Sequence, residues 1–237
     1  MSTRLLDELH HLRNASFHPG INGSLITELE ATHSIVLPRE HWNVLQESNG
    51  IEAYAGYVRL FGMHTTEGID AIVWNQSEHW KFAWGGRCSG YWCFGETAWG
   101  DQYAYALEAL RNGGGTTKVH FLDALSMTCQ IVASSFLEFL EKEFIRSAKD
   151  PYDAMIKQAC QRLGPLEAAS HLVYVPSVLL GGAEDINHVQ KMNARSAMIC
   201  NGDIAMQLDA GPSNRAVKRA QPYEDELHRM RLRLVWT

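Results

Sequence analysis

The chain has 237 residues, of which 46% are hydrophobic and 20% are charged, so it carries enough apolar material for a sizeable core. Its formal net charge is −6, and this sign argues against nucleic acid or an anionic membrane as the main partner, because both require a basic surface. No segment approaches the roughly 18 apolar residues that cross a bilayer, and the charged N-terminus lacks the apolar core of a signal peptide. We therefore expect a cytoplasmic protein of one large domain or two coupled lobes.

Residues 1–50 are predicted to form three helices. Leucines at helical spacing from Leu5 to Leu12 predict the first, which ends before Pro19-Gly20. Ser24 stands where the N-cap of the second helix is expected, and Pro38 suits the first turn of the third. Asn49-Gly50 then supplies a left-handed stop for that third helix.

Residues 54–122 predict an antiparallel meander. Tyr54 to Phe61 is aromatic and β-branched, which favours a strand, whereas residues 69–80 favour a short helix. Three aromatic-rich pieces separated by glycines follow, with the sequences KFAWG, YWCFGE and WGDQYAYAL. Arg111 to Gly115 is predicted to be a flexible hairpin tip, followed by a strand at residues 116–122.

A helix is predicted for residues 130–145, because apolar residues from Ile131 to Phe144 fall on one helical face. The polar stretch after it gives the best domain boundary, which divides the chain into residues 1–146 and 147–237.

The second part is predicted to begin and end with regular elements. Pro151 can begin a helix with the sequence YDAMIKQACQRLG. Near the C-terminus, two alternating segments flank an acidic Pro-Tyr-Glu-Asp turn, which predicts a β-hairpin.

The order of these elements resembles the SUKH superfamily, a group named partly after a fungal cell-wall assembly regulator. The resemblance covers residues 20–145 and is carried by Leu29, Glu30, Leu37, Pro38, Trp42, Leu45, Asn49 and Gly50, with support from Phe82, Ala83, Phe94, Gly100, Asp101 and Tyr103. It implies an α+β fold in which helices flank an antiparallel or mixed sheet meander. In this chain a smaller α+β extension follows and ends in the hairpin.

A second resemblance lies in that extension. The segment LGPLEAASHLVYVPSVLLGG is similar to one near the C-terminus of type VI secretion immunity proteins with a GAD-like front end. The matching residues are Gly164, Pro165, Leu166, Tyr174, Val175, Pro176, Leu180, Gly181 and Gly182. After Gly182 the chain departs from this pattern, because NARSAMICNGDIAMQL is less uniformly apolar than the helix expected there.

The sequence lacks the motifs of common hydrolases and metal sites. Its 11 histidines include no His-Glu-x-x-His, and the adjacent His10 and His11 point to different faces of a helix. There is no Gly-x-Ser-x-Gly, and five irregularly spaced cysteines favour free thiols over disulfides or zinc ligands. We predict no enzyme activity, cofactor or metal, and keep as an alternative a hydrolase in which His79 or His120 acts with Asp101.

Five tryptophans crowd into residues 74–99 and allow two interpretations. In the simpler one, most of them fill the core of a small sheet, since buried aromatic rings contribute strongly to packing. In the other, one or two stay exposed as anchors for a protein partner, inside an acidic rim. The partner-binding residues predicted on that second interpretation are Glu67, Asp70, Glu78, Trp84, Glu96, Trp99 and Asp101.

Both resemblances point to a function in protein binding. Members of these families are mostly bacterial immunity proteins, so the resemblances imply that the chain binds and neutralises a cognate toxin. That toxin would be a polymorphic or type VI secretion effector, such as a nuclease. The alternative is an intracellular scaffold or regulator that binds an endogenous protein. The sequence leaves the identity of the toxin, the contacting face and the oligomeric state open.

Overall fold

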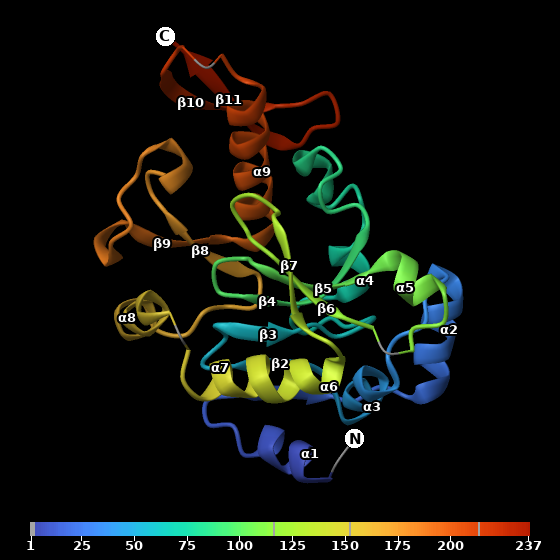
Figure 1. Ribbon diagram of the computed structural model, residues 1–237. Helices are drawn as coiled ribbons and strands as arrows, with labels where there is room; N and C mark the ends of the chain where they lie inside the picture. The colour runs from blue at the N-terminus through green and yellow to red at the C-terminus, as the bar shows by residue number, and fades with distance from the viewer. Residues whose placement is uncertain (1–2, 116, 152, 213) are drawn as a thin grey trace.

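An antiparallel sheet forms the centre of the computed structural model, which describes residues 3–115, 117–151, 153–212 and 214–237 (Figure 1). Within these residues, seven strands follow one another in chain order, and each pairs antiparallel with its neighbour in the sequence. They are β1 (Ser16–Pro19), β2 (Ser48–Ala53), β3 (Val58–Leu60), β4 (Tyr91–Thr97), β5 (Gln102–Ala106), β6 (Val119–Leu122) and β7 (Cys129–Ala133). The α+β class and the antiparallel meander are therefore confirmed, but the piece KFAWG is not one of its strands, because Lys81–Trp84 forms a 3-10 turn, and the strand predicted from Tyr54 to Phe61 is limited to Val58–Leu60.

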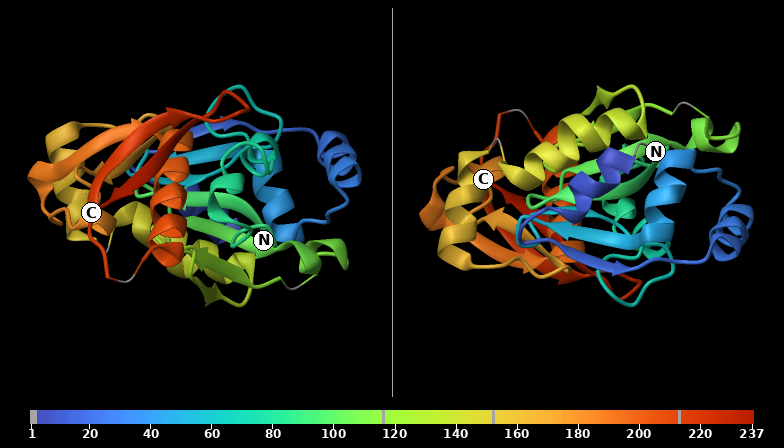
Figure 2. Two further views of the ribbon diagram at one scale, coloured as in Figure 1. Left: turned by 90° about the horizontal axis from the view of Figure 1, so that it is seen from above. Right: turned by 90° about the horizontal axis from the view of Figure 1, so that it is seen from below.

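Helix α1 (Thr3–His10) and the helical residues 136–149 cover one face of this sheet (Figure 2), and the other helices of this part of the chain connect its strands. The described helices up to residue 149 are α1 (Thr3–His10), α2 (Gly23–His33), α3 (Arg39–Glu47), α4 (Ala71–Trp74), the 3-10 turn η1 (Lys81–Trp84), α5 (Leu107–Arg111), α6 (Phe136–Phe139), the π-helical turn η2 (Leu140–Phe144) and α7 (Ile145–Lys149). The last three run on as one helix. Seen from below, this helix and α1 lie across the sheet (Figure 2).

The remainder of the chain covers the opposite face. It comprises α8 (Ala154–Leu163), β8 (Ser170–Tyr174), η3 (Val178–Leu180), η4 (Ile186–His188), β9 (Val189–Asn193), α9 (Ala194–Ala210), β10 (Val217–Glu224) and β11 (Met230–Trp236). Strand β8 pairs with β9, and β10 pairs with β11, both antiparallel. Seen from above, α9 and the β10–β11 hairpin lie over the sheet (Figure 2). The predicted C-terminal hairpin is confirmed, and none of the described helices has the length and apolarity to cross a membrane.

Two hydrophobic clusters hold these layers together, and each draws residues from both sides of the predicted boundary at residue 147. In the larger cluster, the buried Trp84 and Phe94 belong with Met198 of α9. In the smaller one, Tyr57 from the β2–β3 turn belongs with Leu172 of β8. The two predicted domains therefore share their cores.

A buried ion network reinforces this junction. The Arg59 guanidinium lies 2.7 Å from Glu96 Oε1 and donates to the carbonyls of Glu167, at 2.7 Å, and Ser170, at 3.0 Å. His171 Nε2 lies 2.9 Å from the other Glu96 oxygen. Arg59 and Glu96 belong to the sheet, so this buried network joins the sheet to β8 in the interior of the protein.

Two predicted helix boundaries in the first 50 residues are wrong. Helix α2 is capped by Asn22, whose side-chain oxygen accepts from the Ser24 amide at 2.9 Å, so that Ser24 lies inside the first turn. Asn49 and Gly50 lie within β2 and do not stop α3, which ends at Glu47. The Asn49 side chain is committed elsewhere, because it donates to the Met63 carbonyl and accepts from the Met63 amide.

The predicted helix over 130–145 begins too early. Residues 129–133 form the edge strand β7, and Ile131, which was assigned to the helical face, is 57% exposed. The helix begins after Ser135, whose hydroxyl accepts from the Glu138 amide. A strand and a helix that share alternating apolar residues cannot be separated by periodicity alone.

Two predicted turns are also displaced. Arg111 ends α5, and the loop after it is pinned at Gly114, where an added Cβ would lie 1.9 Å from the Val36 carbonyl oxygen. In the C-terminal hairpin, Pro222 to Glu224 belong to β10, and the turn lies between Asp225 and Arg229. The predicted helices at 69–80 and after Pro151 are present as α4 and α8, while Thr116 and Tyr152 lie outside the described residues.

Candidate partner-binding site

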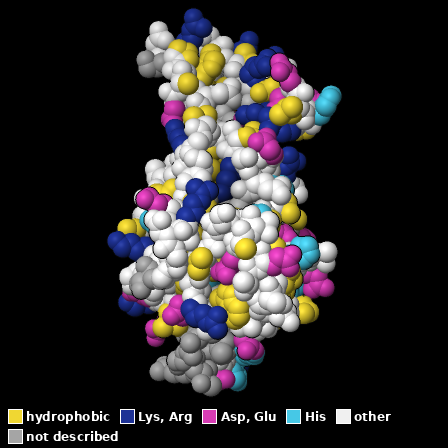
Figure 3. Space-filling model, turned by 90° about the vertical axis from the view of Figure 1, so that its right-hand side faces the viewer, with side chains coloured by type: hydrophobic (Ala, Val, Ile, Leu, Met, Phe, Trp, Pro, Cys, Tyr) yellow, Lys and Arg dark blue, Asp and Glu magenta, His cyan; other side chains and the backbone are white. Residues whose placement is uncertain are grey.

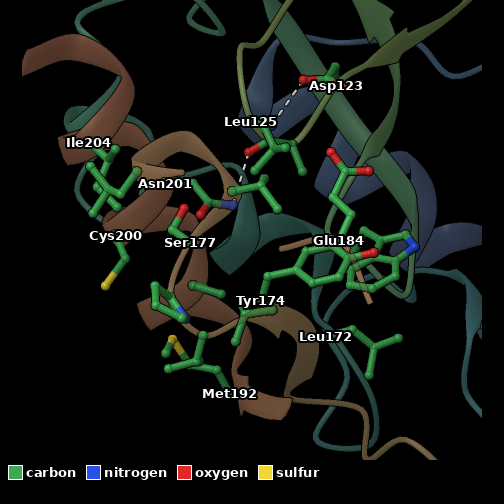
Figure 4. Close-up of a pocket in the computed structure, with 18 of the residues that line it drawn as sticks. Asp123, Leu125, Leu172, Tyr174, Ser177, Glu184, Met192, Cys200, Asn201 and Ile204 are labelled. Carbon is green, nitrogen blue, oxygen red and sulfur yellow. Dashed lines mark hydrogen bonds between the residues drawn. The ribbon is translucent and has the colours of Figure 1, made fainter. Parts of the chain in front are cut away.

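A cavity of about 580 Å³ lies between the sheet and the layer that covers its upper face. Seven parts of the chain line it: the β4–β5 turn, the β6–β7 turn, the N-cap of α8 at Asp153, β8 with the loop after it, β9, α9 and the β10–β11 hairpin. Figure 4 shows Asp123 and Leu125 on one side and Cys200, Asn201 and Ile204 of α9 on another. Its volume falls in the range of roughly 300–1,000 Å³ that ligand pockets occupy.

The β4–β5 turn places Asp101 at the cavity wall. One oxygen of Asp101 accepts a 2.7 Å hydrogen bond from the Thr97 hydroxyl, and the other accepts a 2.9 Å bond from the Ala124 amide. The first bond closes the β4–β5 turn, and the second joins this turn to the β6–β7 turn. Burial raises the pKa of Asp101 above its ordinary value, although both hydrogen bonds oppose that effect.

Trp99 of the same turn stacks on Tyr174 at the end of β8. Their ring centroids lie 4.8 Å apart and the ring planes differ by 11°. The indole N–H of Trp99 donates to Asp153 at 2.7 Å, and the other oxygen of Asp153 caps α8 by accepting from the Met155 amide. Burial raises the pKa of Tyr174, with further contributions from the charges of Asp153 and Glu184. The stack therefore sits among carboxylates.

Asp123 and Glu184 contribute carboxylate oxygens that have no partner in the part of the chain that the structure describes. Asp123 Oδ1 accepts from the Leu125 amide and from the amide and hydroxyl of Ser126, which fixes the β6–β7 turn. Among the described residues, its Oδ2 has no hydrogen-bond partner. Glu184 is exposed at the cavity and has no described hydrogen-bond or ion-pair partner.

Helix α9 forms a fixed wall of the cavity. The Asn201 side chain donates to the Ala124 carbonyl at 3.1 Å, so the helix is tied to the β6–β7 turn. On another side of the helix, the buried Trp84 indole donates to the Met198 carbonyl at 3.0 Å. Both contacts involve backbone carbonyls, so they fix the position of α9 relative to the sheet and the β6–β7 turn.

The lining combines negative charge with apolar walls. Its acidic residues are Asp101, Asp123, Asp153 and Glu184, and no Lys, Arg or His is found among the described residues that line it. Most of the other lining residues are aliphatic. Such a surface can hold a cation that carries an apolar stem, since low-dielectric walls strengthen the attraction of a charge to the carboxylates.

The nucleophiles in this lining are not activated. Burial and the charge of Asp203 raise the pKa of the Cys200 thiol above its ordinary value, and the Ser177 hydroxyl accepts from the Leu179 amide at the start of η3. No histidine lines the cavity among the described residues to act as a base for either group. The part of the chain that the structure describes also holds no group of three or more His, Cys, Asp or Glu placed to bind a metal ion.

The model of the SMI1/KNR4 family (SUKH-1) matches residues 20–142, which is more than half of the chain. The chain belongs to the SMI1/KNR4 family. Its fold is also similar to that of Atu4351 from Agrobacterium tumefaciens, a crystal structure with a TM-score of 0.50 and 12% sequence identity, over 92% of this chain and 94% of that one. No curated protein matches the chain.

The SUKH-1 match contributes the smaller part of the cavity lining. It includes the β4–β5 and β6–β7 turns, whereas Tyr174, α9 and the hairpin follow the last matched residue. The segment that resembles GAD-like immunity proteins supplies Tyr174, Val175, Pro176 and Leu180 to the lining. That second resemblance stays a prediction, because the family match ends before it. The similarity in fold to Atu4351, in contrast, extends over nearly the whole chain and includes both layers.

The structure divides the predicted partner-binding residues of this SUKH-1 protein. Trp99 and Asp101 line the cavity. Trp84 and Glu96 are 0% exposed, so no partner can reach them in this fold. Both belong to the junction between the layers, where Trp84 binds α9 and Glu96 pairs with Arg59. These two residues therefore do not belong to an exposed patch, because aromatic and acidic residues of the meander face the covering layer as well as solvent.

The other three predicted residues lie apart from the cavity. Glu67 pairs with His18 at 3.1 Å, Asp70 caps α4, and Glu78 lies 3.3 Å from Arg229 of the hairpin. On the side shown in Figure 3, basic and acidic side chains are interspersed, and no acidic patch of any extent appears there. The seven residues therefore do not form one surface, and the acids that gather do so in the cavity.

Sequence reasoning missed Asp123, Asp153, Tyr174 and Glu184 as site residues. Asp153 had a local signal, since it stands at the N-cap of the helix predicted after Pro151. Tyr174 lay inside the quoted resemblance. Asp123 and Glu184 carried no local signal, because only the packing of the C-terminal layer brings them to the same cavity.

Proposed function

We propose that this SUKH-1 protein is an immunity protein that acts in the cytoplasm by binding and neutralising a cognate protein toxin. The observation that carries the proposal is the cavity with four carboxylates and no basic residue among its described lining. Membership of the SUKH-1 family supports a protein partner in general. The lack of an activated nucleophile in the cavity favours binding over catalysis.

The charge of the cavity suggests how such an inhibitor would act. A toxin that handles an acidic substrate, such as a nuclease, presents a basic surface, and complementary charge accelerates association. Occupation of that basic surface by the immunity protein would exclude the substrate. Inhibition would then need no chemical change in either protein.

Capture of the partner tests this proposal. The tagged chain would be expressed in the bacterium that encodes it, recovered by its tag and its partners identified by mass spectrometry. We expect one large secreted effector, held through its C-terminal domain, and we expect co-expression of the chain to abolish the toxicity of that domain. Recovery of endogenous cytoplasmic proteins alone would favour the scaffold or regulator and overturn the proposal.

A matched pair of charge reversals tests the role of the cavity. Glu184→Lys places a cation at the cavity, whereas Glu28→Lys makes the same change at an exposed position on α2, at the far end of the molecule (Figure 1). We expect the first variant to lose both capture and protection, and the second to keep both. Equal protection by the two variants would remove the cavity from the proposed function.

A further inference from the structure

We infer that the cavity is a receptor for an arginine side chain on a protruding segment of the partner protein. This inference rests on the proposed function and names the group that the site recognises. It is carried by unpaired carboxylates, a flat aromatic stack and an aliphatic wall that meet in one cavity of about 580 Å³.

The first step is that the acids at the cavity lack cations. Elsewhere in the C-terminal layer, acidic side chains have basic partners: Asp203 pairs with Arg231, Asp209 with Arg87 and Glu167 with Lys191. Asp123 and Glu184 have no such partner among the described residues. A cation brought by a partner would give Asp123 and Glu184 the kind of pairing that these three acids already have.

The second step concerns the shape of the acceptors. Asp123 Oδ2 and the Glu184 carboxylate accept no hydrogen bond from any described residue, and a guanidinium presents several N–H donors in one plane. The Trp99–Tyr174 stack offers a flat surface beside them, with the two rings nearly parallel at 11°. Guanidinium groups stack on aromatic faces and bridge carboxylates, whereas an ammonium acts as a compact point charge. These features favour arginine over lysine.

The third step is the apolar wall. Leu172, Val178 and Leu180 line the cavity together with Ile204 of α9. The three methylenes of an arginine can lie on such a surface while the guanidinium reaches the carboxylates. A free inorganic cation would leave this wall without contacts, so the lining matches an amphipathic side chain.

Small capped amino acids test the inference without any toxin. The purified full chain would be titrated with Nα-acetyl-arginine methylamide, and binding would be followed by the NMR signal of the Trp99 indole N–H, assigned by its loss in Trp99→Phe. We expect a saturable shift. We expect Nα-acetyl-citrulline methylamide, which has nearly the same shape without the charge, to bind more weakly by on the order of ten-fold or more.

The same titration identifies the acceptor. Glu184→Gln is expected to weaken binding of the arginine probe by on the order of ten-fold, whereas Glu28→Gln on α2 should leave it unchanged. Equal binding of the citrulline probe, a Glu184→Gln variant that binds as well as the parent, or no saturable shift would overturn the inference. Tighter binding of Nα-acetyl-lysine methylamide would overturn the choice of arginine.

The two proposals fail separately. If the arginine probe binds but the chain captures no toxin, the proposed function falls and the receptor site stands. If the chain captures and neutralises an effector but the probe does not bind, the receptor site falls and the proposed function stands.

Discussion

Glu96 lies in β4 and is fully buried, Asp101 lies in the turn after β4 and is half-buried, and their pKa values move in opposite directions. Burial alone would raise the pKa of Glu96, but His171 and Arg59 outweigh burial and hold the pKa below its ordinary value of 4.5. Asp101 has only neutral hydrogen-bond donors beside it, so burial prevails and its pKa rises above 3.8. The Glu96 carboxylate therefore stabilises the fold through its ion pairs, whereas the charge of Asp101 at the cavity is disfavoured by burial.

Replacement of Glu96 should destabilise the fold strongly. Glu96→Gln removes the negative partner of a buried arginine, and breaking such a pair costs about 3–5 kcal/mol of unfolding free energy. Because the folded pKa is lowered, the stabilisation by Glu96 is present above the unfolded pKa and is lost as the pH falls through the folded value. Urea unfolding at pH 7 and at pH values below 4.5 measures both effects. Glu28→Gln serves as the exposed control, and a Glu96→Gln variant with its unfolding midpoint unchanged would contradict the expectation.

Replacement of Asp101, unlike that of Glu96, should not lower the unfolding free energy. Asp101→Asn removes a charge that burial disfavours, while the amide can still accept from the Ala124 N–H. We expect the variant to equal or exceed the parent in unfolding free energy at pH 7. The pKa of Asp101 is raised in the folded state, so its buried charge destabilises the parent above that pKa. This cost disappears as the pH falls and the carboxyl is protonated. The difference in unfolding free energy between Asp101→Asn and the parent should therefore shrink in acid. A marked loss of stability in Asp101→Asn at pH 7 would show that the hydrogen bonds outweigh the charge.

At the scale of elements, the sequence predicts the type of an element better than its ends. The meander, α4, α8 and the C-terminal hairpin follow from alternation, glycine turns and caps that are local in the chain. The boundary between β7 and α6 does not, because Ile131 satisfies a strand and a helical face equally well. The sequence likewise predicts that Asn49 ends a helix, although its side chain donates a hydrogen bond to the Met63 carbonyl, 14 residues away in the chain.

The docking of α9 depends on a close approach at Gly202. An added Cβ at this position would lie 2.9–3.0 Å from the backbone and Cβ of Ala83. Alanine raises helix propensity by about 1 kcal/mol, but overpacking against a backbone costs about 1–3 kcal/mol. We therefore expect Gly202→Ala to lower the unfolding free energy on balance, against the propensity scale. Thermal and urea unfolding measure the change.

A second glycine provides the control for this experiment. Gly90 lies before β4, and a Cβ there would meet no heavy atom within 4 Å. Gly90→Ala should leave stability unchanged or slightly raised. If Gly202→Ala behaves in the same way, α9 is not closely packed on η1 and the cavity wall is less fixed than the structure shows.

At the scale of the whole molecule, the candidate site is a product of tertiary packing. Trp99 and Asp101 could be predicted because they lie in one turn of the meander. Asp123, Asp153, Tyr174 and Glu184 come from four further segments, and no spacing in the sequence relates them. A site at the junction of two layers forms only when both layers are in place. For this reason most of the acidic residues predicted from the sequence differ from those that line the cavity.

The same junction predicts how the chain responds to division at residue 147. A fragment of residues 1–146 would lose α9, leaving the Trp84 indole without the Met198 carbonyl, and would lose the Glu167 and Ser170 carbonyls that bind Arg59. Because buried polar groups without partners and uncovered aromatic rings are both unfavourable, we expect the fragment to aggregate or to bind hydrophobic dyes. Addition of the fragment 147–237 should restore part of the native near-UV circular dichroism. The full chain is the control. A fragment of residues 1–146 that unfolds cooperatively and keeps its tryptophans buried would establish two independent domains, and the cavity would then lie at an interface that is able to open.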